Sequence, residues 1–264
     1  MIILKNYVEK ILVIAVIFYF GGISMAQGEI KGRKHIVLLG ASVGKAWNIE
    51  SLPKRLSQSN PTNPSNLSRE MQSLFHWDPT NPKNSINYRF EYVGLYQFDK
   101  SLALEQLLNR KQNKPHAIIL KECAAYFPSD ITFEKAKNLM EQWIAKCQEK
   151  GVVPIPTTVV PVTLSHDEKF KTHNPIKRVI KRILGVDMRT RMERIIEYND
   201  WIKQYSKEKG LVVLDLENPL RISPTDRFLR NDLTKGDGLH LNAEAYRLLD
   251  GIVIPTLEKI KFPN

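Results

Sequence analysis

With 264 residues, of which 42% are hydrophobic and 25% charged, the chain has the composition of an ordinary globular protein with enough apolar material for one core. Its formal net charge of +11 favours acidic partners, either an anionic polymer or a membrane surface. Nucleic acid is excluded as the expected partner, because the basic residues are spread along the chain apart from a cluster at 169–194. A well-solvated basic surface without a specific partner is the common alternative.

The N-terminal residues have the pattern of an export signal. A basic stretch precedes the apolar run Ile11–Phe20, and the small-x-small sequence SMA follows at 24–26. This pattern predicts a signal peptide over residues 1–26, cleaved near Ala26, and an exported (periplasmic or secreted) domain over residues 27–264. The alternative is an uncleaved membrane anchor, although the run is shorter than the ~18–20 apolar residues that a spanning helix needs.

The first predicted strand of the mature chain is Ile36–Leu39, and the small-residue turn GASVG follows it at 40–44. Four apolar residues in a row are typical of a strand buried on both faces of a parallel sheet. Open α/β sheets bind ligands beyond the carboxyl ends of their strands. We therefore expect Ser42 to lie at the functional edge of the sheet.

Strands and helices alternate along the rest of the chain. This alternation predicts an α/β fold, a three-layer α/β/α sandwich with a five-stranded parallel sheet and right-handed crossovers. Prolines in the fourth strand place it near an edge. The predicted strands are 36–39, 88–95, 116–120, 152–160 and 211–216, and the main predicted helices are 101–110, 131–150, 188–209 and one that Asn242 caps.

The two cysteines are predicted to be free. Cys123 ends a strand and Cys147 lies near the far end of the following helix. Sixteen helical residues at ~1.5 Å each separate their sulfurs by roughly 20 Å. This distance is too long for a disulfide, so we expect two mostly buried thiols.

A base for Ser42 is found near the other end of the chain, in GDGLHLN at 236–242. A serine hydroxyl becomes a nucleophile only when a base lies within hydrogen-bond reach. The spacing from Asp237 to His240 lets one turn hold the carboxylate against one imidazole nitrogen and leave the other nitrogen facing Ser42. These three residues are the candidate nucleophile, base and orienting acid, and an ordinary polar turn is the alternative for the last two.

GAS at 40–42 and DGLHLN at 237–242 resemble the first and last motifs of the SGNH (GDSL-type) hydrolases, and the order of elements is similar over about residues 34–260. Ala41 stands where the family usually has Asp. The resemblance implies the flavodoxin-like SGNH fold and an oxyanion hole to which the N–H groups of Ser42 and Gly94 contribute. A glycine needed only to end its strand is the alternative at position 94.

The chain departs from the family after the third strand. There the family usually has Gly-x-Asn-Asp, whose Asn side chain donates to the oxyanion, and this chain has KECA at 121–124. Either the N–H groups of Ser42 and Gly94 suffice, or Lys121 or another side chain replaces the Asn, or the protein is a binding relative with little activity.

Three further residues are candidate substrate contacts. A carboxylate at Glu122 would repel a developing oxyanion. We therefore expect it to pair with a basic residue such as Lys121 or Lys45, or to form a hydrogen bond with a substrate hydroxyl. Thr158 is expected near the tip of the fourth strand, where it would line the substrate pocket together with Lys121.

The region 164–186 is the least similar to the family. His166, Asp167 and His173 do not have the spacing of a closed zinc site, and a surface loop is the favoured interpretation. The segment Ile176–Leu184 is basic and amphipathic, which suits contact with a membrane or an anionic polymer, or packing on the domain with solvated charges.

Together these patterns predict an exported serine esterase that hydrolyses acyl esters, with acetyl or other short acyl groups on a polysaccharide as the favoured substrate and lipid esters next. The chemistry needs no metal and no organic cofactor. The alternatives are a catalytically weak carbohydrate- or surface-binding relative of the fold, and an acyltransferase that passes the acyl group to another alcohol.

Overall fold

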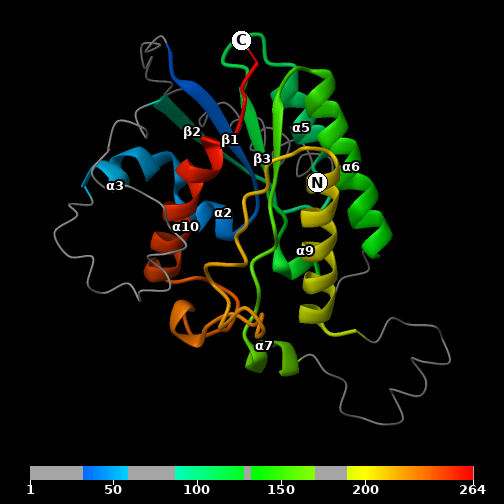
Figure 1. Ribbon diagram of the computed structural model, residues 1–264, viewed down its shortest axis with the longest axis vertical. Helices are drawn as coiled ribbons and strands as arrows, with labels where there is room; N and C mark the ends of the chain where they lie inside the picture. The colour runs from blue at the N-terminus through cyan, green and yellow to red at the C-terminus, as the bar shows by residue number, and fades with distance from the viewer. Residues whose placement is uncertain (1–31, 59–86, 128–131, 170–188, 264) are drawn as a thin grey trace, which may run out of the picture. The chain divides into compact units, whose positions relative to one another are not determined.

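The computed structural model describes residues 32–58, 87–127, 132–169 and 189–263 (Figure 1). The described residues from Arg33 onward belong to one compact unit. The predicted signal peptide, residues 1–26, and the basic segment Ile176–Leu184 lie outside these ranges. Within them, no helix has both the length and the apolar character needed to cross a membrane.

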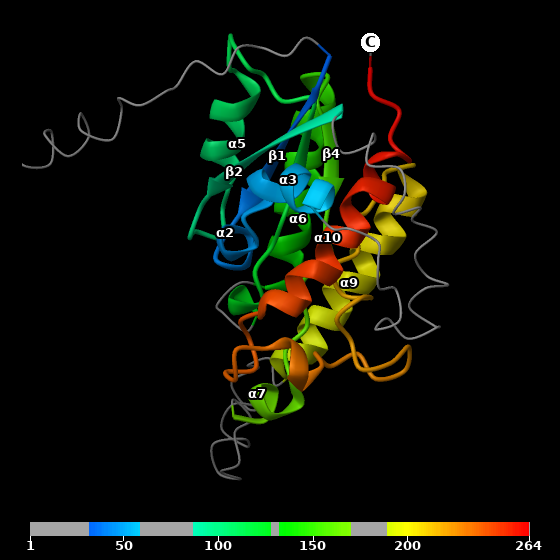
Figure 2. The ribbon, with the colours of Figure 1, turned by 90° about the vertical axis from the view of Figure 1, so that its left-hand side faces the viewer.

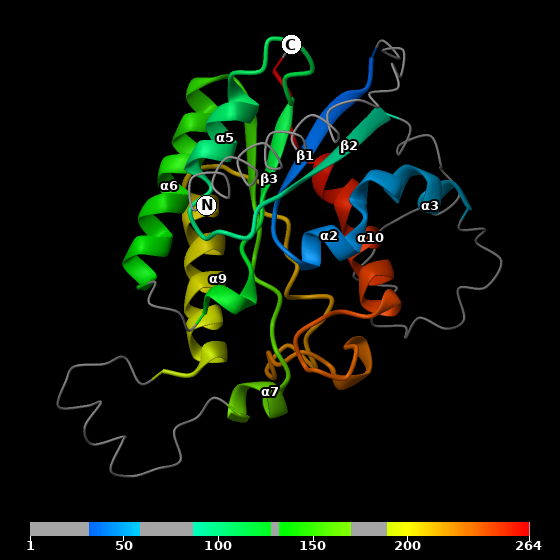
Figure 3. The ribbon, with the colours of Figure 1, turned by 180° about the vertical axis from the view of Figure 1, so that it is seen from behind.

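Four parallel strands form the centre of the fold. In the sheet they follow the order β2-β1-β3-β4, so β1 and β3 are central (Figure 3). The register pairs Gly40 of β1 with Gly94 of β2 and Leu39 of β1 with Leu120 of β3. The carboxyl ends of these three strands are therefore level at one edge. The strands are β1 (Lys34–Gly40), β2 (Tyr88–Gly94), β3 (Ala117–Leu120) and β4 (Val153–Pro156).

The predicted fifth strand, 211–216, is reduced to one parallel bridge between Leu214 and Thr157. Val153 and Thr157 donate their N–H groups toward β3. Because donors alternate along a strand, the positions between them face the fifth segment, and two of these are Pro154 and Pro156, which have no N–H. Thr158 is left to donate to Leu214 O at 3.3 Å.

Helices cover both faces of the sheet, which confirms the predicted three-layer sandwich (Figures 1 and 2). One core cluster joins the sheet to α2, α3 and α10, and the other joins it to α5, α6 and α9. Strand β1 supplies both clusters through alternate residues, with Ile36 in one and Val37 in the other. The helices are α2 (Val43–Trp47), α3 (Leu52–Gln58), α5 (Ser101–Leu108), α6 (Phe133–Glu149), α7 (Leu164–Lys169), α9 (Arg191–Glu208) and α10 (Ala243–Leu257).

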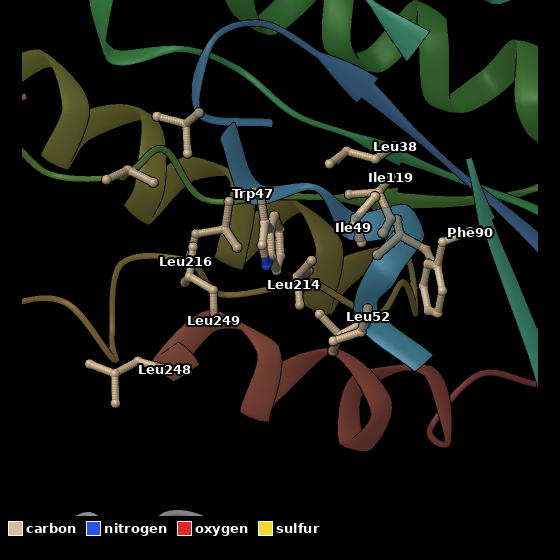
Figure 4. Packing of buried hydrophobic residues seen from close by; sticks show 14 of the residues in the cluster. Leu38, Trp47, Ile49, Leu52, Phe90, Ile119, Leu214, Leu216, Leu248 and Leu249 are labelled. Atoms are coloured by element: carbon tan, nitrogen blue, oxygen red, sulfur yellow. The ribbon is translucent and has the colours of Figure 1, made fainter. Parts of the chain in front are cut away.

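The cluster beneath α10 packs α2 and α3 against this helix. Trp47 lies among leucines from the chain's C-terminal half, including Leu214 and Leu249 (Figure 4). Its indole N–H donates to Asp250 Oδ1 at 2.7 Å, and Arg55 donates to both oxygens of the same carboxylate. This contact ties α2 and α3 to α10.

Several local predictions hold. Asn242 caps α10, since its side chain accepts from the N–H of Ala245 at 3.0 Å. Gly151 follows the last turn of α6 with a φ of 67°, a conformation that suits glycine. Cys123 and Cys147 are both free and buried.

Candidate active site

Ser42 lies at the start of α2, directly after β1. The chain reverses here because the N–H of Gly44 donates to Ala41 O at 2.7 Å and that of Ala46 donates to Ser42 O at 3.0 Å. A larger residue at Gly40 would be tightly packed, since a Cβ there would lie 3.0 Å from the Cβ of Lys121. The turn is thus packed tightly from behind and leaves Ser42 half-buried.

The thiol of Cys123 is the side-chain neighbour of Ser42. Strands β2 and β3 flank β1 on opposite sides, which makes the β1/β3 border the topological switch point where sheets of this type bind ligands. Cys123 follows β3 at this border, and its Sγ lies 3.6 Å from Ser42 Oγ. Within KECA, Cys123 occupies the third place, where the SGNH pattern has its Asn.

Asp237 and His240 form a closed hydrogen-bonded turn. Asp237 Oδ2 lies 2.5 Å from His240 Nδ1, and Oδ1 accepts from the backbone N–H groups of Leu239 and His240 at 2.9 and 2.8 Å. Burial raises the pKa of Asp237, but these hydrogen bonds and the charge of His240 outweigh it and hold the pKa well below its usual range. An ionised Asp237 therefore keeps the proton of His240 on Nδ1 and leaves Nε2 as the basic nitrogen.

This turn lies against the segment that follows β4. The N–H of Thr163 donates to Gly238 O at 3.0 Å, and His166 Nδ1 lies 2.9 Å from Asp237 O. Arg191 Nη1 lies 2.6 Å from His166 Nε2. Burial lowers the pKa of Arg191, and the charge of Asp167 opposes that shift.

The structure brings together Asp237 and His240, and separately Ser42 and Cys123. In the described ranges, Ser42 Oγ is hydrogen-bonded to Cys123 and not to His240. The side chains of His240 and Asp237 are each 48% exposed, so the imidazole ring has room to turn. Catalytic hydrogen bonds are often long or unmade before substrate binds.

Gly94 lies at the end of β2, opposite Gly40 in the register. A Cβ at Gly94 would lie 3.0 Å from the hydroxyl and ring of Tyr92, whose hydroxyl donates to Gly40 O at 3.0 Å. Glycine at this position thus leaves room for the ring and hydroxyl of Tyr92. The donation of the Gly94 N–H to an oxyanion stays a prediction.

Glu122 pairs with a basic residue, as expected, but its hydrogen-bonded partner is Lys100 rather than Lys121 or Lys45. Lys100 Nζ lies 2.7 Å from Glu122 Oε1, with both side chains buried. Lys121 Nζ donates instead to the backbone oxygen of Glu122 at 2.9 Å. Burial raises the pKa of Glu122, and Lys100 opposes the shift. Three aromatic rings surround Lys100 Nζ, those of Phe98, Tyr126 and Trp143.

Thr158 is also fully buried. Its hydroxyl lies 3.0 Å from Asp215 Oδ1 and accepts from the N–H of Glu217 at 2.9 Å, which ties the end of β4 to the following segment. Lys121, Glu122 and Thr158 thus have protein partners in this structure, and their burial gives no support to a role in contacting substrate.

The interpretation of His166 and Asp167 as a surface loop is wrong. Both are buried on α7, and Asp167 Oδ1 accepts from the N–H of Met192 at the start of α9. A six-residue helix has too little periodicity to be recognised in the sequence. His173 lies outside the described residues. In the described part of the chain, no group of three or more His, Cys, Asp or Glu could hold a metal.

Solved structures of lipolytic proteins share this architecture. A GDSL-like lipase from Bacteroides thetaiotaomicron VPI-5482 aligns over 86% of this chain and 88% of its own, with a TM-score of 0.53 and 15% identity. A lipase/acylhydrolase from Enterococcus faecalis aligns over 88% and 100%, with a TM-score of 0.53 and 15% identity. A member of the lipolytic protein G-D-S-L family from Veillonella parvula DSM 2008 aligns over 86% and 100%, with a TM-score of 0.52 and 13% identity. No protein-family model and no curated protein matches the sequence.

Proposed function

Since the chain has the SGNH (GDSL-type) hydrolase fold, we propose that it is an exported serine esterase that works through an acyl-enzyme. The observation that carries the proposal is the 2.5 Å contact between Asp237 Oδ2 and His240 Nδ1. It supplies an imidazole with a free basic Nε2, in a turn packed on the segment that follows β4. Ser42 follows β1 in the same parallel sheet.

The proposed reaction has two steps. Ser42 Oγ attacks the acyl carbon while His240 Nε2 accepts the hydroxyl proton, and Asp237 stabilises the imidazolium that forms. The N–H groups of Ser42 and Gly94 stabilise the oxyanion, and His240 returns the proton to the departing alcohol. Water then attacks the acyl-enzyme with His240 as base, which releases the acid and restores Ser42. For the first step the imidazole turns toward Ser42 and replaces Cys123 as its hydrogen-bond partner.

For the substrate we propose acetyl or other short acyl groups on a polysaccharide, with lipid esters next. The export pattern of residues 1–26 supports a substrate outside the cytoplasm. The net charge of +11 supports an anionic surface. The reaction as written needs no metal and no organic cofactor.

Labelling with a fluorophosphonate probe, located by peptide mass, tests the chemistry before the substrate is known. Ser42 is expected to carry the label, and Ser42→Ala to lower the hydrolysis of a short-chain aryl ester by about 10³-fold or more. Ser57→Ala, at an exposed serine of α3, is the matched control and should retain the wild-type rate. Full activity in Ser42→Ala would contradict the proposal.

A catalytically weak carbohydrate-binding relative is the second candidate, because a thiol stands at the Asn position and no hydrogen bond joins His240 to Ser42 in the described residues. It predicts that polysaccharide binds, that Ser42 is not labelled and that Ser42→Ala leaves binding unchanged. If an acylated sugar forms when an acceptor sugar is added, the same acyl-enzyme serves an acyltransferase.

A further inference from the structure

The backbone of Asp237 is held from behind by a buried histidine. His166 lies on α7 with 9% exposure, and its Nδ1 is 2.9 Å from the carbonyl oxygen of Asp237. A carbonyl oxygen only accepts hydrogen bonds, so Nδ1 of His166 carries the proton in this contact.

The other side of the same ring is held by Arg191. Its Nη1 lies 2.6 Å from His166 Nε2, and a guanidinium only donates, so Nε2 is the accepting nitrogen. The two contacts agree on one tautomer of His166. Arg191 is 9% exposed, and little water competes for either hydrogen bond.

The turn and α7 also touch through their backbones. The N–H of Thr163 donates to Gly238 O at 3.0 Å, and Thr163 Oγ1 accepts from the N–H of His166 at 3.2 Å. Thr163, directly before α7, and His166, on α7, therefore hold two successive carbonyl oxygens of the Asp237–His240 turn, those of Gly238 and Asp237.

We propose that His166, held by Arg191, is a positioning residue that fixes the backbone of Asp237 and thereby aims the imidazole of His240 at Ser42. The inference rests on the proposed function. A contact from outside the turn is needed because the side chains of Asp237 and His240 are both 48% exposed, and their hydrogen bonds to each other do not fix the turn relative to the sheet. A misplacement of about 1 Å at a reacting group is enough to slow an enzyme by ~10²-fold.

Two variants separate this role from a merely structural one. His166→Asn places an amide N–H near the position of Nδ1 and retains the donor to Asp237 O, whereas His166→Leu removes it. We expect kcat on a short-chain aryl ester to fall by ~10²-fold in His166→Leu with KM within about twofold, and to stay within about fivefold of wild type in His166→Asn. Equal losses in the two variants, or no loss in His166→Leu, would overturn the inference.

A matched control removes a different histidine. His116 lies at the amino end of β3, where its Nδ1 accepts from the N–H of His35 at 2.9 Å. His116→Leu should lower the melting temperature but leave kcat within about twofold of wild type. If kcat falls as far in His116→Leu as in His166→Leu, both losses come from lower stability, and the inference is overturned.

Imidazole ring signals of ¹³C-labelled histidine provide a readout that does not depend on activity. The His240 signals are expected to shift and broaden in His166→Leu and to stay at their wild-type positions in His166→Asn. Unchanged His240 signals in His166→Leu would refute positioning whatever the rate. If Ser42→Ala retains full activity, the proposed function fails, and the His240 signals still decide whether His166 holds the turn.

Discussion

Ser42 Oγ and Cys123 Sγ lie 3.6 Å apart at the carboxyl ends of two neighbouring strands. Cys123 is 5% exposed, so little water reaches this contact. A thiol is a weak hydrogen-bond donor compared with an amide N–H. An oxyanion that forms beside Ser42 thus meets a poorer donor on this side than on the side of the backbone N–H groups.

Cys123→Asn should raise activity, because it places an amide donor beside Ser42 in a side chain of similar volume. One preorganised donor contributes about 10²–10³ to kcat in a well-placed oxyanion hole, so an increase of at least ~10-fold is expected for aryl ester hydrolysis. Cys123→Ala is the control, since it removes the thiol without adding a donor and should not raise kcat. If Cys123→Asn is no faster than Cys123→Ala, the thiol position does not face the oxyanion.

The layers of the fold could be predicted from the sequence because they follow from apolar runs and their alternation. The four apolar residues of Ile36–Leu39 became the buried centre of β1, and Asn242 became a helix cap. The fifth strand could not be predicted correctly, since its loss depends on which neighbour Pro154 and Pro156 face. That direction is set by the register of β4 against β3.

In the candidate site, too, local contacts could be predicted and contacts between distant segments could not. The contact between Asp237 and His240 spans three residues, so local spacing was enough to predict it. The contacts of Cys123 with Ser42 and of His166 with Asp237 span 81 and 71 residues, and they depend on where the strands end. No sequence pattern indicates such neighbours before the sheet order is known.

Breaking the buried ion pair beside the site should destabilise the protein strongly. Lys100 and Glu122 have side-chain exposures of 0% and 2%, so either charge alone would be buried without its partner. Lys100→Met is expected to lower the free energy of unfolding by about 3–5 kcal/mol, measured by urea denaturation. In the double variant Lys100→Met/Glu122→Gln part of this loss should be recovered, because neither side chain of the pair is then charged, although the buried Lys121 beside them remains. If the loss of stability in the double variant equals the sum of the losses in Lys100→Met and Glu122→Gln, this prediction is wrong.

Glu91 should make stability depend on pH in the acid range. Burial raises the pKa of Glu91, but its contacts with His35 and Arg110 outweigh it and lower the pKa from 4.5 to about 2. The folded pKa lies below the unfolded one, so the contribution is complete above pH 4.5 and is lost as the pH falls toward 2.

With allowance for solvent screening of a side chain that is 29% exposed, Glu91 contributes about 2 kcal/mol at neutral pH. Glu91→Gln should lower the free energy of unfolding by about that amount at pH 7 and by progressively less toward pH 2. Glu105→Gln, on the exposed face of α5, should change it by less than ~0.5 kcal/mol at either pH. A difference between Glu91→Gln and wild type that stays constant with pH would contradict the assignment.

Two glycines at the Asp237–His240 turn, Gly236 and Gly238, provide a matched pair for the packing of that turn on α7. Both have positive φ, 94° and 75°, so alanine at either position costs about 1–2 kcal/mol in backbone strain. They differ in their surroundings, because a Cβ at Gly236 meets nothing within 4 Å, whereas one at Gly238 would lie 2.3 Å from Thr163 Oγ1 and 2.8 Å from His166 Cβ. Gly238→Ala must therefore push the turn away from α7, and Gly236→Ala need not.

We expect Gly238→Ala to be the less stable variant in urea and to lower kcat by at least ~10-fold more than Gly236→Ala. Equal kcat values would show that the turn reaches Ser42 without its contact to α7.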